Sequence, residues 1–254
     1  MSGLEGKVAV VTGGGRGIGR AIALRLARDG ASVVVSSRTS SELEAVAGEI
    51  AACGSRGLAV VADAAEQVQA REPVRRALAE FDRIDILVNN AGGIVGMHDT
   101  FDGGDESFAA TMLLNVHSAW WASTAALPAM RDRGFGRIVN IGSTESTQAN
   151  EGGPIAYVAG KHALAGMTRQ FAHNVGPHGI TVNCICPGWT NTAMVDFANL
   201  AVHMGTSAEA ARAYAEGQCA LKCIMVPEDI AAMTAFLFSD GGARITGQLL
   251  AVDG

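Results

Sequence analysis

Short apolar runs alternate with amphipathic stretches along the whole chain. Several of the runs are rich in valine and isoleucine and lack the in–out alternation of a half-exposed strand, so they predict strands covered on both faces. The predicted strands are Val8–Val11, Ser32–Ser36, Leu58–Val61, Ile84–Val88, Arg137–Ile141, Thr181–Cys186 and Leu249–Val252. The predicted helices are Ile18–Asp29, Ser41–Ala52, Glu66–Glu80, Glu106–Arg131, Ile155–Val175 and Glu228–Phe238.

This order of elements predicts an α/β fold. Alternating strands and helices give a single doubly wound, Rossmann-like parallel sheet of about seven strands with helices on both faces. No linker or repeat divides residues 1–254, so we expect one dinucleotide-binding catalytic domain. Residues 192–226 break the alternation and follow a strand, so we expect them to form a substrate lid at the carboxyl edge of the sheet.

A glycine-rich turn follows the first strand. Gly13, Gly17 and Gly19 are spaced through the turn, with Arg16 and Ile18 between them. Glycine lets the backbone approach a pyrophosphate closely, and the next helix presents its positive end to that group. The turn therefore predicts a dinucleotide site.

The end of the second predicted strand bears on which dinucleotide binds. An NAD site usually has Asp or Glu there to bind the adenosine ribose. Here Ser37-Arg38 closes the run, and Arg38, helped by Arg16, could form charge-assisted hydrogen bonds to a 2′-phosphate. NADP(H) is favoured over NAD(H), although both arginines could equally be solvated surface residues.

Composition and charge exclude several other classes. With 48% hydrophobic and 17% charged residues, the chain can bury a sizeable core. Its net charge of −6 argues against nucleic-acid binding. The first residues lack a secretory signal, and no apolar run reaches the length of a membrane span. The five cysteines show no metal-ligand spacing, so we expect reduced thiols, no metal and a cytoplasmic location.

Three further motifs lie downstream. Asn90-Ala91-Gly92 ends the fourth strand, Ser143 ends the fifth, and Tyr157-Val-Ala-Gly-Lys161 lies in a helix. Together with the glycine turn, these motifs resemble those of the short-chain dehydrogenase/reductase family, and the resemblance covers the whole chain.

The resemblance implies a nicotinamide-dependent oxidoreductase acting on a carbonyl or alcohol carbon. Tyr157 and Lys161 share one helix face because they lie one turn apart. An ammonium beside a phenol stabilises the phenolate, so Tyr157 could act as acid or base. Ser143 would orient the reacting oxygen, Lys161 would also bind the nicotinamide ribose, and Asn115 would hold a proton-relay water.

The resemblance also implies contacts to the rest of the cofactor. Asp63 would hold the adenine, and Asn90, Ala91 and Gly92 would line the adenosine ribose side. Pro187, Gly188 and Thr192 would contact the nicotinamide end, and Thr190 would act there mainly through its backbone.

The sequence limits the substrate only loosely. Met97, Trp189 and Met194 suggest an apolar, adaptable pocket wall, although each could equally be core packing, and Glu145 argues against an anionic group near the reacting carbon. A free ketone or secondary alcohol, of which a cyclic or aromatic one is an example, is favoured. The alternatives are a 3-oxoacyl-thioester on a carrier protein, an NAD-dependent alcohol or diol dehydrogenase, and a non-catalytic NADP(H)-binding regulator. By resemblance, the long helices and the last strand predict a homotetramer.

Overall fold

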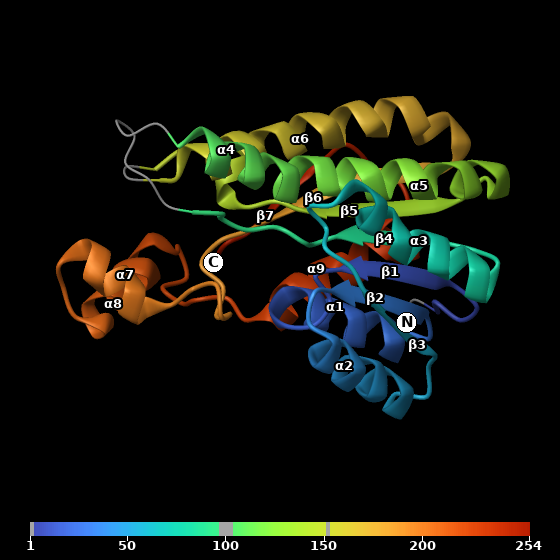
Figure 1. Ribbon diagram of the computed structural model, residues 1–254, viewed down its shortest axis with the longest axis horizontal. Coiled ribbons are helices and arrows are strands. Elements are labelled where there is room, and N and C mark those ends of the chain that lie inside the picture. Colours follow the sequence, from blue (N-terminus) through green and yellow to red (C-terminus); the bar gives the residue numbers. More distant parts are fainter. Residues whose placement is uncertain (1–2, 97–103, 151–152) are drawn as a thin grey trace.

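The seven strands form one parallel sheet in the order β3-β2-β1-β4-β5-β6-β7. The computed structural model describes residues 3–96, 104–150 and 153–254 (Figure 1). The strands are β1 Val8–Thr12, β2 Ser32–Ser37, β3 Gly57–Val61, β4 Ile86–Asn89, β5 Gly136–Ile141, β6 Ile180–Pro187 and β7 Leu249–Val252. This confirms the predicted Rossmann-like fold, with strand ends that differ by up to two residues from the sequence prediction.

Helices cover both faces of the sheet (Figure 1). In one apolar core the strands pack against α1, α2 and α9, and in the other against α3, α5 and α6. Because both faces are covered, the central strands carry apolar side chains on each side. The helices are α1 Gly17–Arg28, α2 Ser40–Ala52, α3 Gln67–Phe81, α4 Asp105–Met112, α5 Ser118–Arg133, α6 Ile155–Val175, α7 Phe197–Met204, α8 Ala208–Gln218 and α9 Pro227–Phe238.

The sheet reverses its winding direction between β1 and β4. β1 pairs with β2 on one side and with β4 on the other, all in parallel. The chain leaves β1 toward β2 and leaves β4 toward β5, so the two connections run in opposite directions along the sheet. They leave a crevice between them at the carboxyl edge. The fold therefore places the glycine turn after β1 beside the loop after β4.

The prediction of a single α-helix over Glu106–Arg131 is wrong in the middle of that range. The segment from α4 to α5 is continuous, but Leu113–His117 form a π-helical turn. The side chains of Asn115 and Ser118 donate to the carbonyl oxygens of Thr111 and Leu114, 2.8 Å and 2.6 Å away. Those carbonyls are the α-helical acceptors for these residues, so the side chains compete with the backbone there.

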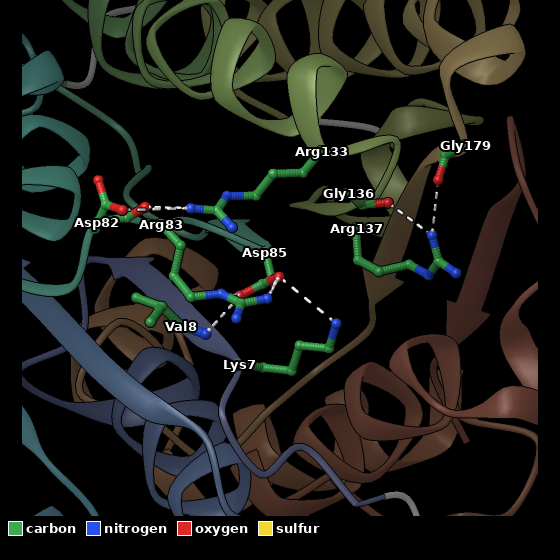
Figure 2. Close-up of polar contacts among 9 residues, drawn as sticks. All are labelled: Lys7, Val8, Asp82, Arg83, Asp85, Arg133, Gly136, Arg137 and Gly179. Atoms are coloured by element: carbon green, nitrogen blue, oxygen red, sulfur yellow. Dashed lines mark hydrogen bonds and ion pairs between the residues drawn. The ribbon is translucent and has the colours of Figure 1, made fainter.

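The opposite, amino edge of the sheet is held by one buried carboxylate. Asp85 is 1% exposed and accepts hydrogen bonds from the backbone of Val8 (2.9 Å) and from two nitrogens of Arg83 (2.8 and 2.7 Å). Lys7 lies 3.6 Å from the same carboxylate (Figure 2). Asp85 thereby joins the start of β1 to the segment that leads into β4.

A third cation at this edge, Arg137, lies over the Phe135 ring, as Lys7 also does. The Arg137 guanidinium stacks 4.4 Å from the centre of the Phe135 ring and donates to the carbonyl oxygens of Gly136 and Gly179 (Figure 2). Burial lowers the pKa of Arg137 from its ordinary value. The contacts lie at the opposite edge from the crevice, so they support the fold.

Candidate active site

A large cleft opens at the carboxyl edge of the sheet. Its volume is about 1540 Å³, and its described wall comes from the loops after all seven strands and from the segment containing α7 and α8. Arg16 and Arg38, after β1 and β2, are the only basic side chains among the described lining residues. The basic side chains that line the cleft therefore lie at one end of it.

The glycine turn forms the floor of the cationic end. Gly13 and Gly17 have φ angles of +63° and +53°, a conformation that favours glycine. A Cβ on Gly19 would lie 2.2 Å from the Gly13 carbonyl oxygen, so only glycine lets α1 pack this closely. The first turn of α1 carries no acidic side chain and no side-chain cap, which leaves its N–H groups for an anionic ligand.

Thr12 and Asn90 lock this turn to the loop after β4. The Thr12 hydroxyl oxygen accepts from the backbone of Asn90 and Ala91, each at 3.0 Å. The Asn90 amide donates to the carbonyls of Thr12 (2.9 Å) and Gly13 (3.0 Å). Asn90 therefore shapes the glycine turn with its amide, and Thr12 is a residue that motif reasoning missed.

The two arginines have different surroundings. Arg38 is exposed and makes no hydrogen bond or ion pair with the described residues, whereas Arg16 lies 3.8 Å from Glu42. Glu42 comes from the first turn of α2 and lines the same wall. It is a second residue that sequence reasoning missed, because only the packing of α2 brings it to the glycine turn.

Asp63, which follows β3, lines the same end of the cleft as Arg38. One of its carboxylate oxygens accepts from the backbone of Ala65 at 2.9 Å, and the described residues leave the other oxygen open to a ligand. Its own backbone N–H donates to Gln69 at 2.9 Å.

A buried lysine lies at the centre of the site. Lys161 is 4% exposed, and its ammonium donates to the carbonyl oxygen of Ile141 at 2.9 Å. The same nitrogen lies 5.3 Å from the centre of the Tyr157 ring. A Cβ on Gly92 would approach it to 3.3 Å. The end of β5, the loop after β4 and α6 therefore all meet at this charge.

Asn115 holds the loop after β4 from the other side. It is 1% exposed, and its amide donates to the Gly93 carbonyl (2.7 Å) while its oxygen accepts from the Gly93 N–H (3.1 Å). A Cβ on Gly92 would lie 2.9 Å from this oxygen. The π-helical turn thus carries a clamp that fixes Gly92 and Gly93 against Lys161.

Ser143 begins a short 3₁₀ turn at the end of β5. Its hydroxyl oxygen accepts from the backbone of Glu145 at 3.2 Å, and α6, which carries Tyr157, packs against this turn. The hydroxyl proton of Ser143 has no acceptor among the described residues. Ser143 can therefore still donate a hydrogen bond to a ligand oxygen.

Two thiols lie directly behind the Ser143 turn. The sulfur atoms of the buried Cys184 and Cys186 are 3.9 Å apart. The hydrogen bond from Cys184, with further ones from Ser146 and the Ser143 backbone, lowers the pKa of Cys186 to about 7, and the Lys161 charge contributes. The same pairing raises the pKa of Cys184. These thiols are part of the packing that supports Ser143.

The segment after β6 contributes to the wall of the cleft and then returns to the sheet. Its two ends are joined, because Asn191 donates to the Met225 carbonyl (2.8 Å) and Met225 donates to the Trp189 carbonyl (2.9 Å). Between them the chain forms α7 and α8, which project from the rest of the molecule (Figure 1). Thr192 lies 3.4 Å from a Cβ built on Gly17, and Met194 lies 3.4 Å from one built on Gly93.

The structure brings most of the sequence-predicted residues to this cleft. Those that line it are Gly13, Arg16, Gly17, Ile18, Arg38, Asp63, Asn90, Ala91, Gly92, Glu145, Gly188, Trp189, Thr192 and Met194. Gly19, Pro187 and Thr190 lie behind the wall, and Thr190 turns its hydroxyl to the Gly188 carbonyl. Asn115, Ser143, Tyr157 and Lys161 adjoin it through neighbours such as Gly92, Thr144 and Pro154. Met97 lies outside the described residues.

Comparison with known proteins identifies the class. A model of the short chain dehydrogenases matches residues 7–202. The chain belongs to the short-chain dehydrogenase/reductase family. It is therefore an oxidoreductase that acts on CH–OH and C=O groups, as the resemblance of its motifs implied.

Individual relatives match over nearly the full chain. The short-chain reductase protein NovJ of Streptomyces niveus is 37% identical, covering 97% of this chain and 92% of that protein. The 3-oxoacyl-[acyl-carrier-protein] reductase of Escherichia coli is 37% identical, covering 98% and 97%. A short-chain dehydrogenase from Burkholderia cenocepacia, solved with NADP, is 39% identical with a TM-score of 0.88, covering 99% and 98%.

Proposed function

We propose that this short-chain dehydrogenase/reductase interconverts a ketone and a secondary alcohol with NADP(H), using Tyr157 as the acid or base. The single observation that carries the proposal is the buried Lys161 ammonium, fixed by the Ile141 carbonyl and 5.3 Å from the Tyr157 ring centre. A buried cation beside a phenol favours the phenolate, which is the form that remains after a proton is given away.

The residues present fit a dinucleotide. The cleft is large, the first turn of α1 carries no acidic side chain, and Arg38 has no partner among the described residues. Gly13, Gly17, Ile18 and Gly19 would hold the pyrophosphate on the α1 N-terminus. The nicotinamide end would lie near Pro187, Gly188, Thr190 and Thr192, and the adenosine near Asp63, Asn90, Ala91 and Gly92.

Bound NADP(H) supplies or takes up the hydride. In the reductive direction the Tyr157 hydroxyl donates its proton to the carbonyl oxygen of the substrate. The Ser143 hydroxyl donates a hydrogen bond to the same oxygen, since its proton has no acceptor among the described residues and its oxygen already accepts from the Glu145 N–H. Lys161 stabilises the phenolate and binds the nicotinamide ribose. Asn115 holds the Gly92–Gly93 loop against these groups and keeps the relay water.

The preference for NADP(H) over NAD(H) rests on Arg38. Charge-assisted hydrogen bonds of this kind contribute about 1.5–3 kcal/mol, which corresponds to roughly a 10- to 150-fold preference. Arg38→Ala should therefore raise the Michaelis constant for NADPH by that factor and leave the constant for NADH nearly unchanged. Steady-state kinetics with both cofactors measure this.

Two further variants sharpen that test. Arg16→Ala is expected to have the smaller effect, because Glu42 already offsets the charge of Arg16. Adding Ser37→Asp to Arg38→Ala should turn the enzyme toward NADH. If the wild-type enzyme uses NADH as well as NADPH, and Arg38→Ala affects both alike, Arg38 does not bind a 2′-phosphate.

One alternative has its own support. The 37% identical reductase of Escherichia coli is named for a 3-oxoacyl substrate on a carrier protein. A carrier-bound substrate would also place a carbonyl at Tyr157, so assays with a 3-oxoacyl-carrier protein and with free ketones distinguish the two. An NAD-dependent alcohol dehydrogenase would show itself in the cofactor test above, and a non-catalytic regulator would oxidise no NADPH with any substrate.

We also propose that the enzyme is a homotetramer. Large apolar side chains are exposed on α4, α5 and α9, among them Phe108, Trp120 and Phe236 at 42%, 46% and 46% exposure. Contacts between copies of the chain would remove these surfaces from water. Light scattering should give about four times the 26.1 kDa chain mass, and a monomer mass that does not change with concentration would contradict the proposal.

The location proposed for the enzyme is the cytoplasm. All five cysteines are free, as expected in a reducing compartment. No helix in the described part of the chain is long and apolar enough to cross a membrane.

A further inference from the structure

The Glu145 carboxylate has an unsatisfied oxygen beside the reaction centre. Glu145 lies two residues after Ser143, and its backbone N–H donates to the Ser143 hydroxyl oxygen at 3.2 Å. One carboxylate oxygen accepts from the Asn150 amide. The other is buried and has no hydrogen-bond partner among the described residues.

An unpaired buried carboxylate oxygen is costly. Leaving a buried acceptor without a donor incurs a desolvation penalty, which is larger when the group is charged. Glu145 also lines the cleft, and rotation of its carboxylate about the last side-chain torsion exchanges the two oxygens, so a substrate in the cleft can supply the missing donor. The position of Ser143 fixes where the reacting oxygen lies, and Glu145 is the next acidic group along the same turn.

The charged side chains of the surrounding wall also favour a neutral or cationic substrate. Among the described lining residues beyond β4, the charged side chains are Glu145, Asp196 and Asp253, all acidic. The oxygens of Asp196 already accept from the backbone of Ala198 and Asn199 and from the Asn199 side chain. Asp253 is exposed, so Glu145 is the acidic lining residue with a buried oxygen that is unpaired among the described residues. The nearby Lys161 ammonium does not line the cleft and is paired with the Ile141 carbonyl.

We propose that Glu145 determines substrate specificity by accepting a hydrogen bond from a hydroxyl or ammonium group that the substrate carries on the first or second carbon from its carbonyl carbon. The substrates are then neutral or cationic donor-bearing ketones, and carboxylate-bearing ketones are rejected. The inference rests on the proposed function, because the reacting carbonyl is placed by Ser143 and Tyr157.

A matched substrate series tests this. The hydroxyketone probes are 2-hydroxy-1-phenylethanone and 3-hydroxy-1-phenylpropan-1-one, each compared with its methyl ether. The aminoketone is 2-amino-1-phenylethanone, and the anionic ketone is phenylglyoxylate. A hydrogen bond to a charged acceptor is worth roughly 10- to 150-fold, so the wild-type kcat/KM for at least one hydroxyketone should exceed that for its ether by at least about 10-fold. Phenylglyoxylate should be the poorest substrate.

Two variants separate charge from hydrogen bonding. Glu145→Leu removes the acceptor and should abolish the preference of the hydroxyketone over its ether. Glu145→Gln keeps an acceptor but no charge, so it should retain part of that preference. Its kcat/KM should fall below the wild-type value for the cationic aminoketone and rise above it for phenylglyoxylate. Glu216→Gln is the matched control, since Glu216 pairs with Arg212 on α8 and does not line the cleft. It should leave all of these ratios as in the wild type.

The outcomes are distinguishable from failure of the proposed function. Equal wild-type kcat/KM for both hydroxyketones and their ethers, or ratios unchanged in Glu145→Leu, would overturn the role of Glu145 while leaving the ketoreductase intact. No NADPH oxidation with any probe would instead count against the proposed function. Calorimetric titration of the NADP⁺-loaded protein would then decide, because tighter binding of a hydroxyketone than of its ether must disappear in Glu145→Leu.

Discussion

Replacing Tyr157 with phenylalanine should lower turnover by about 100-fold or more, the usual contribution of a positioned general acid. The fold should tolerate the change, because the Tyr157 hydroxyl makes no hydrogen bond with the described residues. The phenyl ring would keep its place beside Lys161 on the same face of α6. NADPH consumption slowed by at least that factor, with an unchanged NADPH dissociation constant, is the expected result.

Lys161→Ala provides the contrast to this variant. It should lower turnover and also weaken NADPH binding, because the ammonium serves both the phenolate and the ribose. Fluorescence titration with NADPH separates the two variants. Retained turnover in Tyr157→Phe would remove the tyrosine from the mechanism, and tight cofactor binding in Lys161→Ala would contradict the ribose contact.

Asp85→Ala should lower the free energy of unfolding by about 3 kcal/mol or more, because removing one partner of a buried ion pair typically costs that much. The variant leaves Arg83 and Lys7 without their carboxylate and leaves the Val8 N–H without an acceptor. Figure 2 shows these groups converging on Asp85. Denaturant unfolding at a fixed protein concentration measures the loss.

An exposed ion pair gives the matched control. Arg56 and Glu80 are 2.7 Å apart, but their side chains are 64% and 46% exposed. Such a pair contributes about 1 kcal/mol at most, so Glu80→Ala should change the unfolding free energy by less than that. Similar losses in the two variants would show that the Asp85 network does not hold the amino edge of the sheet together.

The sequence by itself determined the order of elements and most of the cofactor end of the site. Uninterrupted apolar runs predict covered parallel strands, and this local pattern was enough for the sheet. The glycine turn was also local, since the φ angles of Gly13 and Gly17 and the free α1 N-terminus depend on neighbours in the chain. The one-turn spacing of Tyr157 and Lys161 likewise follows from helix geometry alone.

Only the tertiary structure decided how these groups are connected. The π-helical turn at Leu113–His117 was missed because side-chain bonds to backbone carbonyls, which no periodicity records, replace the α-helical pattern. Lys161 is fixed by a carbonyl from β5, and Arg16 is offset by Glu42 from α2. The unpaired oxygen of Glu145 is likewise visible only in the fold. Each depends on packing between segments distant in sequence, and burial then sets whether a charge is screened by water or must find a partner.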